Sequence, residues 1–133
     1  MKVTRFDASD SLIVVRAWLW GPRGKAKLDL ALDTAATHTH IVPDIVDELG
    51  YNPQQGEKIL SVQSAVGREP GYLIRVSRFK ALGFSATDFR VHVHDLGEGI
   101  GIDGLLGLTF LRQFNIEIRP AEGRLLVDRV SPG

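Results

Sequence analysis

The chain has no cysteine among its 133 residues. This absence excludes disulfide bonds, cysteine-ligated zinc and thiol nucleophiles, and it is compatible with an oxidising or a reducing compartment. No segment carries a long run of charge of one sign, and 16 basic residues balance 16 acidic ones. Nucleic-acid and anionic-membrane binding depend on clustered Lys and Arg, so the composition argues against both kinds of partner.

Long apolar segments are missing as well. Residues 1–7 contain no apolar stretch of the kind that a signal peptide has. The longest apolar run, residues 12–20, is interrupted by Arg16 and is too short to cross a bilayer. We therefore expect a soluble, cytoplasmic protein without a membrane segment, or a domain excised from a longer chain.

The residues that are present suit a packed core. Hydrophobic residues make up 44% of the chain and charged residues 24%, which is typical of a compact globular domain rather than a disordered one. We expect one domain over residues 1–133, with its core at roughly 10–128.

Short alternating segments predict a strand-rich fold. Residues 12–20 and 25–32 flank the turn cluster Gly21 to Gly24 and predict a hairpin. A second hairpin is expected at residues 59–64 and 71–79, around a tip of small residues. Further strands are expected at 89–95, 115–119 and 124–130, and short helices at 43–50 and 107–114. The predicted class is all-β, or β-dominated with two short helices.

The most informative motif is Asp33-Thr34-Ala35-Ala36. It follows the alternating segment 25–32, and Asp33 falls on the polar phase where that strand ends. An acid followed by a hydroxyl residue and two small residues predicts a sharp turn that fixes one carboxylate. An Asp in a turn that only caps local backbone N–H groups is the competing interpretation.

A second motif, Leu105-Leu106-Gly107, follows some seventy positions later. Together with the order of the elements, the two motifs resemble the retropepsin-like aspartic proteases, which are the retroviral proteases and their cellular and bacterial relatives. The bacterial group is most similar, because its acid motif precedes a helix that ends near a Leu-Gly pair, here Leu49-Gly50. That group also has a late Leu-Leu-Gly-hydrophobic-x-Phe-Leu segment, here residues 105–111. The resemblance implies a closed, barrel-like β fold with one lobe per chain.

The resemblance also implies the roles of the active-site loop. Asp33 would be the catalytic acid, and Thr34 would join a hydroxyl network that locks two such loops together. Ala35 and Ala36 would line the floor of the cleft.

Two further segments receive roles from the same resemblance. Ala65, Val66 and Gly67 would form the tip of a flap that closes over a bound peptide. Leu105, Leu106 and Gly107 would brace the active-site loop.

The implied activity is that of an aspartic endopeptidase. This chemistry needs two carboxylates that share a proton, and the chain has one such turn, so the resemblance implies a homodimer acting on a peptide or protein substrate. No metal and no other cofactor is expected. The segment Gly99 to Gly104 matches a dinucleotide-binding fingerprint in its glycine spacing, but the helix expected after it is too short for a βαβ unit.

One residue departs from the family pattern. Ala35 stands where most of the family has glycine, and its methyl group would crowd a packed dimer axis or strain a backbone of positive φ. A catalytically inactive dimer that binds peptides or serves as a scaffold is therefore an alternative function.

The histidines form two His-x-His pairs, His38 with His40 and His92 with His94. His92 and His94 share the polar phase of their strand with Arg90, so we expect them on a solvated sheet face. A metal- or ligand-binding β domain that uses these pairs is a second alternative.

Overall fold

The computed structural model describes residues 1–64, 67–97 and 99–130. Thirteen elements follow one another along these residues. They are β1 (Lys2–Arg5), β2 (Val14–Gly21), β3 (Gly24–Leu32), β4 (His40–Ile41), α1 (Pro43–Glu48), the 3-10 helix η1 (Pro53–Gln55), β5 (Glu57–Ser64), β6 (Gly67–Ala81), β7 (Phe84–Val93), β8 (Gly104–Leu106), α2 (Leu108–Leu111), β9 (Phe114–Arg119) and β10 (Arg124–Arg129).

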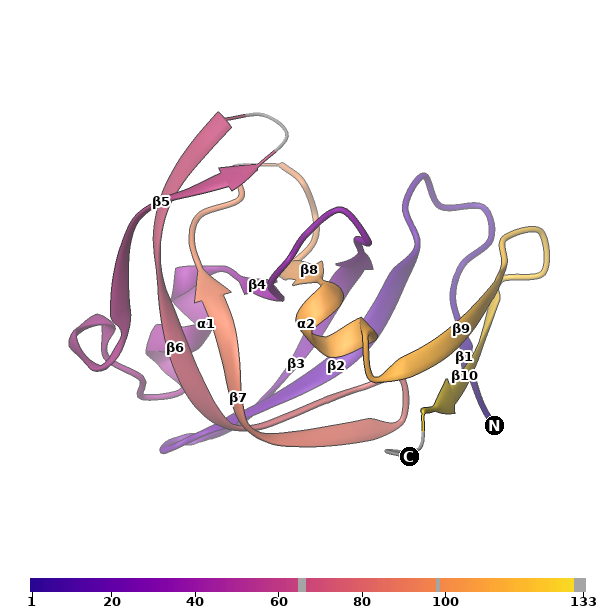
Figure 1. Cartoon of the computed structure of the whole chain (residues 1–133), viewed down its shortest axis with the longest axis horizontal. Coiled ribbons are helices and arrows are strands. Elements are labelled where there is room, and N and C mark those ends of the chain that lie inside the picture. Colours follow the sequence, from indigo (N-terminus) through magenta and orange to yellow (C-terminus); the bar gives the residue numbers. More distant parts are fainter. Residues whose placement is uncertain (65–66, 98, 131–133) are drawn as a thin grey trace.

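A closed barrel forms the body of the molecule (Figure 1). Its strands follow the order β2-β3-β8-β4-β7-β6, and pairing of β6 with β2, from Ala17↔Ala81 to Trp20↔Arg78, closes the ring. Strand β5 extends the sheet beyond β6, and the β5–β6 hairpin rises from one end of the barrel. The expected class, a β-dominated, barrel-like fold with two short helices, is confirmed.

A separate three-stranded sheet, in the order β1-β10-β9, lies beside the barrel (Figure 1). Strand β1 was not predicted, because four residues carry too little alternation to be recognised. It forms by pairing antiparallel with β10 at the other end of the sequence, Lys2↔Val127 to Arg5↔Arg124. The first and the last strand of the chain therefore pair with each other in this sheet.

The core is held together by phenylalanines from four elements. Phe110 of α2 packs edge-to-face on Phe79 and Phe89, with ring centroids 5.3 and 5.8 Å apart. Phe114 extends the cluster to Phe84, and the centroids of these two rings lie 4.8 Å apart. Phe79 and Phe110 are 0% and 1% exposed. The cluster ties α2 to strands β6, β7 and β9.

Element boundaries differ from expectation in β6, β7 and around α2. Strand β6 spans Gly67–Ala81 where 71–79 was expected, and β7 spans Phe84–Val93 where 89–95 was expected. A helix of two turns was expected at 107–114, but α2 ends at Leu111 and Phe114 already pairs with Arg129 in the three-stranded sheet. Leu105 and Leu106, just before the expected helix, belong to the short strand β8. Pairing with β3 and β4 defines β8, and a three-residue strand has no visible period of its own.

No helix in the described parts of the chain is both long enough and apolar enough to span a membrane.

We expect Phe110→Ala to lower the free energy of unfolding by about 3–5 kcal/mol, because a fully buried aromatic ring leaves a cavity. Phe84→Ala is the matched control, since Phe84 is only half-buried at the edge of the cluster, and its loss should be smaller. Urea unfolding followed by circular dichroism measures both. Equal losses in the two variants would contradict the central position of Phe110.

Candidate functional site

Asp33 lies at the point where β3 leaves the barrel. Its N–H donates to the carbonyl of Leu106 at 3.0 Å, directly after the parallel pair Leu32↔Leu106. Its side-chain Oδ1 accepts a hydrogen bond from the Ala35 N–H at 2.9 Å. The strand pairing fixes the backbone of Asp33, and the turn fixes its carboxylate. The side chain is half-buried, so the carboxylate is both held and accessible.

The residues after Asp33 form an open turn. Thr34 and Ala35 are exposed, and Ala36 is half-buried. The Ala36 N–H donates to the Asp33 carbonyl at 3.3 Å. Ala35 does not have a positive φ, so the alanine methyl causes no backbone strain within this chain. Compared with the glycine that most of the family has here, Ala35 adds only the volume of one exposed methyl group.

The start of α2 is hydrogen-bonded to this loop. The N–H groups of Leu108 and Thr109 donate to the carbonyls of Ala36 and Thr37 at 2.8 and 2.9 Å. The Gly107 N–H donates to Oγ1 of the buried Thr39 at 3.2 Å. Leu106, Gly107 and the first turn of α2 are therefore brought against the Asp33 loop.

Glycine is needed at position 107 because the two segments pack backbone to backbone. A Cβ atom there would lie 2.2 Å from the His38 carbonyl oxygen and 2.9 Å from that of Ala36. Gly104 is equally confined, at 1.9 Å from the His40 carbonyl oxygen. The Leu-Leu-Gly motif thus combines two strand residues with a glycine that permits close approach.

Two supporting residues were not singled out from the sequence. Thr39 accepts the Gly107 N–H across 68 positions of sequence. The Asp103 carboxylate accepts the N–H of Asp29 at 2.8 Å, which holds the beginning of β8 against β3. Thr and Asp are common in loops, so the sequence does not mark Thr39 and Asp103 as special. Their role depends on hydrogen-bond partners that are 68 and 74 positions away.

An apolar hollow adjoins Asp33. Its volume is about 460 Å³. Its lining, apart from Asp33, consists of aliphatic side chains: Leu12, Ala31, Leu32, Leu96, Ile100, Ile102 and Leu105. The hollow can take up an apolar group next to the carboxylate.

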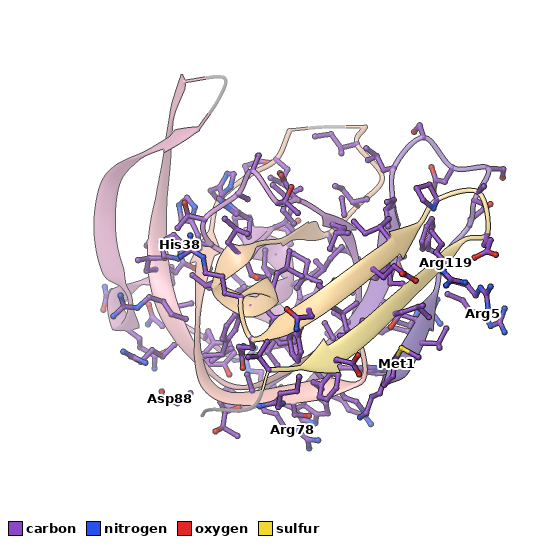
Figure 2. The ribbon with its side chains drawn as sticks, turned by 45° about the vertical axis from the view of Figure 1, so that its right-hand side comes forward. Met1, Arg5, His38, Arg78, Asp88 and Arg119 are labelled. Carbon is purple, nitrogen blue, oxygen red and sulfur yellow. The ribbon has the colours of Figure 1, made fainter. Side chains whose placement is uncertain are left out.

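The predicted flap residues are only partly described. Strands β5 and β6 pair antiparallel up to Ser64↔Gly67, so Gly67 opens β6 beside the end of β5. Ala65 and Val66 lie outside the described residues. The hairpin stands on the side of the molecule where the half-buried His38 is found (Figure 2).

The expectation that His92 and His94 face solvent was wrong. His92 is 0% exposed and His94 4%, while His40 is 7% exposed. Strand β7 starts with exposed and half-buried residues and becomes fully buried at its end. There β4 pairs alongside it, with His40 opposite His92. The alternation along β7 was real, but its polar face is covered at this end of the strand.

Burial lowers the pKa of His40 to about 4 and that of His92 to about 3, and neighbouring histidines add to both shifts. The pKa of His38 is lowered as well, first by burial and then by the charge of Arg90. His40 and His92 are therefore neutral at pH 7. Their neutral rings keep a lone pair on one nitrogen each.

Comparison with known proteins gives a family match and several structures of similar fold. The family model described as aspartyl protease matches residues 19–110, which include Asp33 and the Leu-Leu-Gly motif. A retropepsin-like aspartic protease from Rickettsia conorii superposes with a TM-score of 0.68 at 18% identity, over 94% of this chain and 87% of that one. EIAV protease, complexed with the inhibitor HBY-793, gives 0.58 at 16% identity, over 78% and 88%.

A third solved structure is longer than this chain. The aspartic proteinase from Irpex lacteus matches with a TM-score of 0.58 at 17% identity, over 98% of this chain but only 47% of that one. At such identities the likeness is one of fold. No curated protein sequence matches the chain.

Gly107→Ala should weaken the site by pushing α2 away from the Asp33 loop. We expect the free energy of unfolding to fall by roughly 1–3 kcal/mol, as when an extra methyl group is inserted into a closely packed region. We also expect the Asp33 carboxylate to be held less firmly. Urea unfolding measures the first effect. An unchanged unfolding midpoint would contradict the close packing at Gly107.

Proposed function

Because the chain belongs to the retropepsin-like aspartyl protease family, we propose that it is an aspartic endopeptidase that acts as a homodimer. Asp33 from each subunit supplies one half of the catalytic dyad. The observation that carries the proposal is the fixed position of Asp33: its N–H donates to the Leu106 carbonyl, its carboxylate accepts the Ala35 N–H, and the residue lines an apolar hollow.

The need for a second subunit follows from the single acidic turn. The chain has one Asp-Thr-small segment, while this chemistry uses two carboxylates. The two-to-one length ratio to the Irpex lacteus proteinase, of which this chain covers 47%, supports the view that one chain corresponds to half of a complete enzyme. The exposed Thr34 and Ala35 would then meet their counterparts across a two-fold axis.

The proposed catalytic domain spans the whole chain. Strand β1 pairs with β10, and the buried core extends from Val15 to Val127.

Two carboxylates about 3 Å apart cannot both ionise cheaply, so the dyad holds one proton that belongs to the pair. The ionised Asp33 accepts a proton from a bridging water as the water oxygen attacks the peptide carbonyl carbon. The protonated partner donates a hydrogen bond to the carbonyl oxygen, where negative charge develops. Proton transfer to the nitrogen then releases the amine. The reaction needs no metal or other cofactor.

An extended peptide is the substrate that suits this site. The β5–β6 hairpin would provide main-chain hydrogen bonds from above, with Ala65, Val66 and Gly67 proposed as its tip, and the Asp33 loop would provide the floor. The hollow lined by Leu32, Ile102 and Leu105 favours an apolar side chain next to the scissile bond.

Asp33→Asn should lower kcat at mildly acidic pH by at least about 100-fold, because the substitution removes the general base while preserving shape. Cleavage of a peptide library by purified protein measures the loss, and sedimentation establishes that the dimer persists. Undiminished cleavage by the variant would contradict the assignment of Asp33 as the catalytic acid. Peptide binding without turnover by the wild type, over a broad pH range, would instead favour a non-catalytic peptide-binding dimer.

Ala35→Gly should retain or raise kcat/KM. The variant keeps the N–H that supports the Asp33 carboxylate and removes one methyl group per subunit from the proposed axis. Glycine at an unstrained position costs at most about 1 kcal/mol in chain entropy. The measurement is kcat/KM together with the dimer dissociation constant. A large loss of activity in a folded, dimeric variant would contradict this prediction and show that catalysis requires the Ala35 methyl group.

A further inference from the structure

We propose that His40, His92 and His94 form a binding site for a divalent transition-metal ion, with Zn²⁺ as the expected ion. The group of three imidazoles does not include the Asp33 carboxylate, and the proposed peptide hydrolysis does not use these rings. The inference therefore stands independently of the protease activity.

Strand pairing brings the three side chains to one face. His40 of β4 lies directly opposite His92 of β7 in a parallel pair. His94 follows His92 by two positions, so its side chain points the same way. The His92 and His94 N–H groups donate to the carbonyls of Thr39 and Ile41, at 2.8 and 3.3 Å. The backbone thus fixes the three Cα atoms before the rings are considered.

The rings converge through one nitrogen each. Nδ1 of His92 lies 3.1 Å from Nδ1 of His40, and His94 Nε2 is in direct contact with the same His40 atom. The potential ligand atoms all lie within 4.8 Å of one another. Among the described residues this is the group of three His, Cys, Asp or Glu side chains placed closely enough to hold an ion.

The outer nitrogen of His94 shows where this ring carries its proton. Its Nδ1 lies 3.0 Å from the carbonyl oxygen of Asp95, an acceptor that places the ring proton on Nδ1. Its Nε2 therefore presents a lone pair to the cluster. Metal-binding histidines commonly have such an outer hydrogen bond, which fixes the tautomer and the ring orientation.

Each protonation state of the neutral cluster leaves one group unsatisfied. If His92 Nδ1 carries a proton and donates to His40 Nδ1, the lone pairs of His40 and His94 face each other. If His40 Nδ1 carries the proton and donates to His94 Nε2, His92 carries its own proton on Nε2, a buried atom without a hydrogen-bond partner. A cation between the rings binds the lone pairs of His40 Nδ1, His92 Nδ1 and His94 Nε2 together, so that three bonds to the ion replace the single shared proton, while the His92 proton stays on Nε2. Imidazole nitrogen is a preferred ligand of Zn²⁺, and three histidines with one open position form a known type of zinc site.

The surrounding chain leaves room for these rings. A Cβ atom at residue 71 would lie 2.3 Å from His92 Nε2, so Gly71 is what allows the ring to occupy its position. The three imidazoles are at most 7% exposed. Burying them costs desolvation free energy, whereas apolar side chains would fill the same interior without that cost. A bound ion gives the arrangement a physical reason.

The test uses tag-free protein carrying Asp33→Asn, which prevents self-cleavage, after treatment with a chelator. Isothermal titration with Zn²⁺ should show one ion per chain, and Co²⁺ should give the visible spectrum of a low-symmetry nitrogen site. His92→Gln and His94→Gln should each weaken Zn²⁺ binding by roughly 100-fold or more, beyond the loss typical of outer-shell changes. His38→Gln is the matched control, because it removes the one remaining histidine of the four, and it should leave affinity unchanged.

Circular dichroism checks that each variant is folded. Absence of Zn²⁺ binding by the parent protein would overturn the proposal, as would equal affinity in the parent and in folded His92→Gln. If both cluster variants fail to fold, the Co²⁺ spectrum of the parent decides, because a spectrum of hexa-aqua type would exclude coordination by three imidazoles.

Discussion

The parallel pairing of β3 with β8 is the constraint on which the site depends. It aligns Leu32 with Leu106, and the next hydrogen bond, from the Asp33 N–H to the Leu106 carbonyl, fixes the backbone of the acid. Parallel strands cannot be joined by a tight turn, so the chain completes most of the barrel between these two segments. The position of one carboxylate therefore depends on closure of the whole barrel.

Close backbone contact extends this constraint from the strands into α2. Gly104 and Gly107 let β8 and the start of α2 touch the carbonyls that follow Asp33, and Phe110 anchors the same helix in the aromatic core. The mouth of the site, in contrast, has few contacts within the chain, since Thr34 and Ala35 are exposed. A rigid carboxylate beside an exposed turn is what a site completed by a second subunit requires.

The segment from Asp33 to Ile41 serves two separate polar centres. Its first residues form the acidic turn, and its last residues form β4, which pairs with β7 and places His40 among buried histidines. Thr39 connects the two regions, because its hydroxyl accepts the Gly107 N–H and its carbonyl accepts the His92 N–H. A bound ion at the histidines would stabilise β4 and, through Thr39, the support of the acidic loop.

The sequence by itself determined the local features of this protein. Alternation in residues 25–32 predicted the strand that ends at Asp33, and the two motifs pointed to one fold and one acid, because strand period and turn chemistry are properties of neighbouring residues. Only the tertiary structure decided which polar faces are covered. His92 follows the same alternation as an exposed residue, yet it is buried beside His40 of β4. Likewise, Ala35 could be judged strained or unstrained only once its backbone angle was known. Burial and backbone angle arise from contacts between segments far apart in the chain, and no local pattern records them.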